Sequence, residues 1–258
     1  MFSISDAQIN ALLAYFLWPF ARIVGLMLAD PLLSSKSIPR RYKAGFAMFL
    51  TILLAPLLPP MPEVSVVSAQ GTLIVIQQLL IGIIIGAVMR VVMSAVEMAG
   101  FLMGSQMGLG FAMFFDPQHS AQVPAVSRVL SVFATLLFLT FDGHHILIAT
   151  LAESFRLMPI GTPLPSATLQ SVAVWGGQLF GWGLWLSLPV VGTLLVINLA
   201  IGVMTRAAPQ FNVFSFGFPV TLFIGFVALY LSLPLLEPAI SQIYRESFDF
   251  IGGVLKLR

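Results

Sequence analysis

The sequence contains no cysteine, which excludes a disulfide framework, a thiolate metal site and a cysteine nucleophile. Charge is also scarce, since Asp, Glu, Lys and Arg make up 9% of the 258 residues, against roughly 25% in an ordinary soluble domain. The formal net charge of +2 is too small to indicate a nucleic-acid partner. The sequence has no phosphate loop, nucleophile elbow or zinc signature, so we predict no enzymatic activity, no cofactor and no metal.

Hydrophobic residues make up 59% of the chain and gather into long runs. Crossing the roughly 30 Å hydrocarbon layer takes about 20 helical residues, and several runs are long enough. We therefore predict an all-α, polytopic membrane protein built as a single integral membrane domain over residues 1–258. The expected apolar helical segments are about 7–29, 44–58, 72–98, 124–151, 169–204 and 213–236. Because residues 1–8 have no basic n-region, we expect no cleavable signal peptide.

The loop at 30–43 carries four of the twelve basic residues, which places it on the cytoplasmic side by the positive-inside rule. Segment 169–204 has no formal charge. As one continuous helix it would be on the order of 50 Å long, which exceeds the bilayer core. It is therefore either one long kinked helix or a tight hairpin, and Gly181, Gly183 and Pro189 are compatible with both.

Glycines recur at helical spacing in two places. Gly100, Gly104 and Gly108 repeat every four residues, and on a helix they form a strip without side chains. Gly82 and Gly86 form a similar pair. Such strips let a second backbone approach closely, so we predict close helix packing at these five glycines.

Methionine and phenylalanine cluster around the end of the longer strip. Bulky apolar residues on a flexible glycine pair can block a narrow pore and exclude ions by dewetting, and methionine reshapes easily around its contacts. Abundant glycine in a membrane helix is also compatible with a simpler interpretation, namely packing alone. The candidate pore plug or gate comprises Met107, Gly108, Gly110, Phe111, Met113, Phe114, Phe115, Asp116 and Pro117.

Four charged residues lie in or beside apolar runs: Arg22, Arg90, Glu97 and Arg206. An unpaired charge at the centre of a bilayer costs roughly 2.5–3.5 kcal/mol on the insertion scale. We expect these side chains to face protein or water, as structural pairs or as contacts to other subunits. A proton relay is the alternative.

The stretch Asp142-Gly143-His144-His145 resembles a metal site only superficially. Adjacent histidines on a helix point about 100° apart, and no third ligand is close in the sequence. We therefore predict a polar helix boundary here.

Several motifs together resemble the FliR family. The resemblance covers nearly the whole chain in order, and the one departure is His145, which follows the Gly-His of the pattern. The matching stretches are residues 99–112 followed by Asp116-Pro117, 136–139 with 142–144, 153–155, 206–214 with 217–219, Pro31, and Pro39-Arg40.

The resemblance implies a subunit of the flagellar type III protein export gate, to which virulence injectisomes have related homologues. It implies assembly with FliP-like and FliQ-like subunits, and with FlhB-like and FlhA-like subunits, into a helically wound hetero-oligomer of long helical hairpins. Exported flagellar proteins would pass through its pore. The loop at about 107–118 would plug that pore when closed.

The same resemblance implies the bacterial inner membrane, in contact with lipid, within the flagellar basal body and with the core displaced toward the periplasm. The alternative from the sequence is a self-contained secondary transporter or channel of the inner membrane. Transporters of that kind usually carry internal repeats, and we find no clear repeat.

Overall fold

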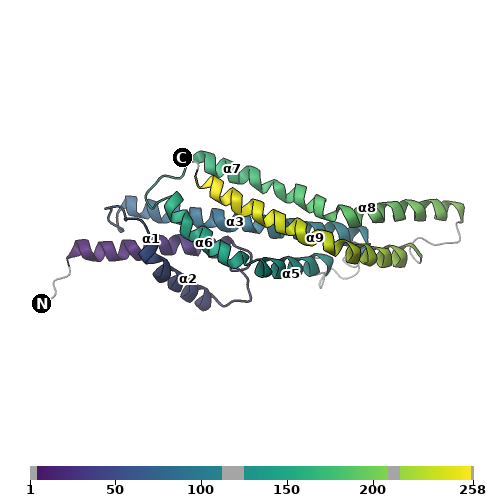
Figure 1. Cartoon of the computed structure of the whole chain (residues 1–258), viewed down its shortest axis with the longest axis horizontal. Helices are drawn as coiled ribbons and strands as arrows, with labels where there is room; N and C mark the ends of the chain where they lie inside the picture. Colours follow the sequence, from purple (N-terminus) through teal and green to yellow (C-terminus); the bar gives the residue numbers. More distant parts are fainter. Residues whose placement is uncertain (1–4, 112–124, 209–215, 257–258) are drawn as a thin grey trace. The chain divides into compact units, whose positions relative to one another are not determined.

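The computed structural model describes residues 5–111, 125–208 and 216–256, and these ranges contain helices and no strand. Two short 3₁₀ turns accompany the α-helices: η1 (Ala55–Leu57) and η2 (Leu109–Phe111). The α-helices, labelled in Figure 1, are α1 (Asp6–Ala29), α2 (Arg40–Leu54), α3 (Ala69–Gln106), α5 (Ala125–Thr140), α6 (Gly143–Leu157), α7 (Ser166–Gly176), α8 (Gln178–Ala207) and α9 (Phe218–Val254). The predicted all-α class is confirmed.

Within the described ranges, four helical stretches are long and apolar enough to cross a membrane: Gln8–Ala29, Ala69–Gln106, Ser166–Ala207 and Phe218–Val254. Taken together as one broken span, α5 and α6 would add a fifth. The polytopic membrane character is therefore confirmed.

Local sequence signals explain where several helices begin and end. Ser5 caps α1, because its hydroxyl accepts from the Gln8 N–H at 3.3 Å while its own N–H donates to Gln8 Oε1 at 3.0 Å. This reciprocal capping box satisfies two free helical donors. The helix stops at Asp30, whose extended backbone (ψ 133°) is the conformation that a following proline favours.

Helix α2 begins at Arg40, four residues before the predicted segment 44–58. Pro39 stands at its N-cap, so three of the loop's four basic residues lie in the first turn of the helix. Segment 169–204 falls within the apolar helical stretch Ser166–Ala207. The backbone at Gly177, between α7 and α8, stays in the right-handed helical region (φ −64°, ψ −23°). Pro189 lies inside α8.

The chain forms two compact units. Unit 1 comprises Met1–Val91, Asp142–Gly176 and Arg245–Arg258, and unit 2 comprises Val92–Phe141 and Gly177–Tyr244. The core of unit 1 includes the fully buried Trp18, Ile23, Ile81, Ile85, Leu151 and Phe155. The core of unit 2 includes the fully buried Met103, Met107, Ala134, Val190 and Leu194.

Candidate packing, charge and gate sites

In unit 1, Gly82 and Gly86 of α3 lie directly against α1. A Cβ added at Gly86 would stand 2.6 Å from the Asp30 nitrogen, and one at Gly82 would come even closer to the Arg22 carbonyl oxygen. Gly25 of α1 reciprocates, because a Cβ there would collide with the Leu79 carbonyl oxygen. The two helices therefore meet backbone to backbone at Gly82 and Gly86. Gly25 has no glycine partner at helical spacing on α1, so the sequence pattern did not reveal it.

Arg22 is fully buried in the core of unit 1. Its Nε donates to Gln78 Oε1 at 2.8 Å, Nη1 to Ser154 Oγ at 3.0 Å and Nη2 to the Met158 carbonyl at 2.8 Å. The guanidinium also lies 4.1 Å from the centroid of the Phe155 ring. All these partners belong to the same chain, so one side chain joins α1, α3 and α6.

Asp30 and Arg90 make hydrogen bonds to the backbone at the C-terminal end of α1 and in the loop that follows it. Asp30 is 1% exposed, and its Oδ1 accepts hydrogen bonds of 2.9 Å from the N–H groups of Leu32 and Leu33. Arg90 donates from Nε to the Ala29 carbonyl and from Nη2 to Ser34 Oγ, both at 2.7 Å. Burial raises the pKa of the Asp30 carboxyl, while the two N–H donors and the charge of Arg90 oppose the increase.

In unit 2, the longer glycine strip has two different roles. A Cβ at Gly100 would collide with the Ser127 backbone of α5, and the Ser127 hydroxyl donates to the Glu97 carbonyl at 2.9 Å. Gly104 is buried on the same helix. Gly108 differs, because its φ of 83° lies in the left-handed region just beyond the end of α3. It therefore ends the helix, as glycine commonly does.

The methionines of α3 pack onto glycines of α8 and α9. Met107 is fully buried, and a Cβ added at Gly225 would stand 2.5 Å from its Cγ. Met98 covers Gly183 in the same way, with Cγ and Sδ both 3.0 Å from a Cβ added there. The methionine-rich pattern pointed to adaptable packing, but it did not identify these two glycines, which lie far along the chain.

The candidate plug is only partly described. Gly110 has no atom of the described residues within 4 Å of the position of an added Cβ, and the backbone of Leu109–Phe111 forms the turn η2. Met113, Phe114, Phe115, Asp116 and Pro117 lie outside the described residues. Plugging thus stays a prediction.

Glu97 and Arg206, the remaining candidate contact charges, are exposed, as is Arg90. Glu97 accepts from Ser131 Oγ at 3.4 Å and lines a pocket of about 390 Å³ together with Arg128, Ser131 and Thr135. Arg206 stands in the last turn of α8, where a positive charge complements the helix dipole.

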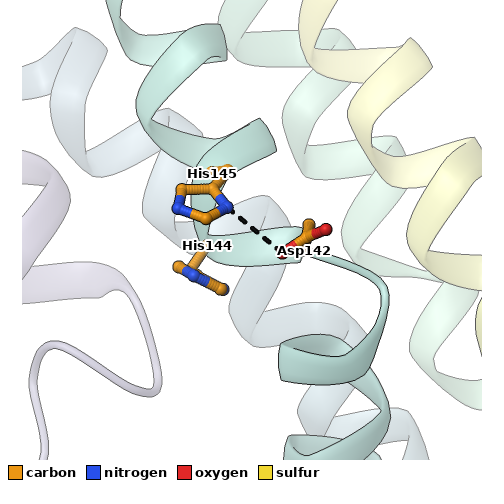
Figure 2. Close-up of side chains that lie close together, drawn as sticks. All are labelled: Asp142, His144 and His145. Carbon is orange, nitrogen blue, oxygen red and sulfur yellow. Dashed lines mark hydrogen bonds and ion pairs between the residues drawn. The ribbon is translucent and has the colours of Figure 1, made fainter.

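The expected polar helix boundary lies at Asp142, the N-cap residue of α6, which has a left-handed backbone (φ 55°, ψ 26°). Figure 2 shows its carboxylate turned toward His145, with Oδ1 3.2 Å from Nδ1. The rings of His144 and His145 do not diverge as expected, because their centroids are 4.0 Å apart.

Comparison with known proteins gives consistent matches. The family described as "Bacterial export proteins, family 1" matches residues 13–247. The "Flagellar biosynthetic protein FliR" of Pectobacterium carotovorum subsp. carotovorum is 42% identical over 241 residues, covering 93% of this chain and 92% of the relative. The protein of the same name from Escherichia coli (strain K12) is 38% identical, covering 99% and 98%. That of Bacillus subtilis (strain 168) is 26% identical, covering 94% and 95%.

Proposed function

Because this chain belongs to the FliR family of bacterial export proteins, and is thus a membrane-embedded subunit of the flagellar export apparatus, we propose that it helps to form and seal the export pore. In this role the chain is a structural and gating part with no catalytic activity of its own. The loop at about 107–118 is the seal, and exported flagellar proteins pass through when it moves aside.

The observation that carries the gating proposal is the anchoring of the segment that leads into this loop. Met103 and Met107 are fully buried at the end of α3, and Met107 packs onto Gly225. Gly108 then ends the helix with its left-handed backbone. A short apolar loop that starts from an anchored helix end can be held at a defined place in a pore. A loop that starts from a frayed helix end cannot.

A second observation concerns the surface that lipid or other subunits must cover. Helices α8 and α9 expose many large apolar side chains within unit 2. These residues are Phe180, Leu184, Trp185, Leu188, Leu195, Val196, Leu199, Val203, Phe218, Phe223, Phe226, Val227, Tyr230, Leu231 and Leu235. We propose that FliP-like and FliQ-like subunits cover this surface together with lipid, and that FlhB-like and FlhA-like subunits join the complex. The proposed location is the bacterial inner membrane, in the flagellar basal body, with the core displaced toward the periplasm.

Co-purification tests the proposed assembly. The tagged chain, extracted from its own cells in a mild detergent, should elute as a large hetero-oligomer that contains FliP-like and FliQ-like subunits. A solitary monomer whose thermal stability rises with an added solute would contradict the proposal and favour a self-contained transporter.

A further inference from the structure

The Asp–His–His cluster, defined as Asp142, His144 and His145, brings three potential metal ligands together at the start of α6 (Figure 2). One ligand atom from each residue lies within 4.8 Å of the other two, and no other such group of three occurs among the described residues. All three residues belong to unit 1.

Asp142 places its carboxylate beside the first turn of α6. Its left-handed conformation turns the chain into α6, and its carbonyl accepts from the N–H groups of His145 at 2.9 Å and Ile146 at 3.1 Å. The 100° spacing of adjacent helical residues would separate the two rings. At the first turn of α6, however, their centroids are 4.0 Å apart, with an angle of 39° between the ring planes.

The spacing suits a first-row divalent metal. A tetrahedral zinc ion with bonds of about 2.0–2.1 Å holds two ligands about 3.3 Å apart. Asp142 Oδ1 and His145 Nδ1 are already 3.2 Å apart. Their side chains are 72% and 70% exposed, so they can adjust to an ion arriving from water. Nδ1 of His144 is buried and has no hydrogen-bond partner among the described residues, which leaves this imidazole with unused bonding capacity.

The donor set selects the ion. Two imidazoles and one carboxylate are the ligands of many zinc sites that keep a position open for water. Hard ions such as Mg²⁺ and Ca²⁺ prefer oxygen ligands alone. The N-terminal end of a helix disfavours cations, but the carboxylate of Asp142 offsets part of the positive charge.

We propose that Asp142, His144 and His145 bind one Zn²⁺ ion per chain, with water in the remaining coordination position. The ion replaces the hydrogen bond between Asp142 and His145 and ties the turn residue to the first turn of α6. This site is independent of the pore-sealing role, and its failure would leave that role untouched.

Titration of the full chain in detergent, purified without a polyhistidine tag, tests the proposal. Calorimetry with ZnCl₂ should give saturable binding of one ion per chain, and Co²⁺ should produce visible absorption bands that Zn²⁺ abolishes. Zn²⁺ should also raise the melting temperature by mass action. The absence of saturable binding would overturn the proposal.

Three variants assign the ligands. Asp142→Asn keeps a residue that tolerates the left-handed backbone, so the fold is retained while Zn²⁺ binding weakens by about tenfold or more. His144→Ala combined with His145→Ala should abolish binding. His119→Ala removes the one other histidine of the chain and should leave binding unchanged. Equal affinity in all variants, or loss of binding in the His119 variant alone, would show that the ion binds elsewhere and would refute the site.

Discussion

Arg22 of α1 and Gln78 of α3 are joined by a hydrogen bond of 2.8 Å from Nε to Oε1, with both side chains fully buried. The guanidinium has neutral oxygen partners and the Phe155 ring around it. A buried charge of this kind depends on every hydrogen bond it makes. The pair therefore fastens α1 to α3 at the place where Gly82 brings their backbones together.

Removal of one member of this pair should be costly. Gln78→Leu removes a hydrogen bond to a charged group, worth about 1.5–3 kcal/mol. Arg22→Met leaves the buried oxygens of Gln78 and Ser154 without their donor. The double variant should be less destabilised than the sum of the two single variants, because it buries neither an unpaired charge nor an unpaired amide. Unfolding of each variant in detergent measures the coupling, and strict additivity would contradict it.

The glycine contact between α1 and α3 predicts opposite results for two equivalent substitutions. Gly82→Ala places a methyl group against the Arg22 carbonyl and should destabilise by about 1–3 kcal/mol through overpacking. Gly45→Ala is the matched control, because Gly45 is exposed inside α2 and an added Cβ would have no atom within 4 Å in the part of the chain that the structure describes. That change should stabilise by about 0.5–1 kcal/mol through helix propensity. Melting temperatures that move in the same direction would refute the interpretation.

Asp30 predicts a pH-dependent difference between the wild type and Asp30→Asn. Burial raises the folded-state pKa above the ordinary value of 3.8, so the folded protein favours the protonated acid. The contribution of Asp30 to stability is thus greatest below 3.8 and falls as the pH rises through the folded pKa.

Asparagine retains the Oδ1 acceptor for Leu32 and Leu33 and does not titrate. The stability of Asp30→Asn relative to wild type should therefore increase from about pH 4 to neutral pH, as measured by denaturation at several pH values. Asp30→Ala serves as the control for the acceptor and should be destabilised at every pH, by about 1–3 kcal/mol. A difference between Asn and wild type that is constant with pH would contradict the assigned pKa shift.

Arg206 tests the contact between subunits. Its exposed position in the last turn of α8 means that Arg206→Glu should alter the stability of the chain itself by only about 0.3–1 kcal/mol. Co-purification of the FliP-like and FliQ-like subunits should nevertheless decrease. Arg206→Lys preserves the charge and should preserve assembly, and full assembly of the Glu variant would exclude Arg206 as a subunit contact.

The sequence predicted the helical class from its composition, and the four-residue glycine spacing singled out Gly82, Gly86 and Gly100 as packing candidates, because both are local signals. It could not predict the partners of Arg22, which lie 56, 132 and 136 residues away. Nor did the spacing distinguish Gly100, which packs on α5, from Gly108, which ends α3. That difference depends on a backbone angle, since both glycines fit the same periodic pattern.

At the candidate zinc site, too, the sequence predicted only part of the arrangement. Helical geometry predicted that the rings of His144 and His145 would diverge, but their centroids lie 4.0 Å apart, because the 100° spacing fixes the Cβ directions and not the side-chain rotamers. The preceding Asp142 has a left-handed backbone. Asp is one of the few residues that adopt this conformation readily, so that signal was present in the residue type. The conformation itself could be known only from the structure.

Ion conductance of the assembled complex in planar bilayers tests the pore seal most directly. Deletion of Gly110–Phe115 should make the closed complex leak ions while its subunits still co-purify. Phe111→Ser, Phe114→Ser and Phe115→Ser combined should do the same at unchanged loop length, because a polar loop no longer excludes water. Intact complexes of both variants that remain as tight as wild type would contradict the assignment of this loop as the seal.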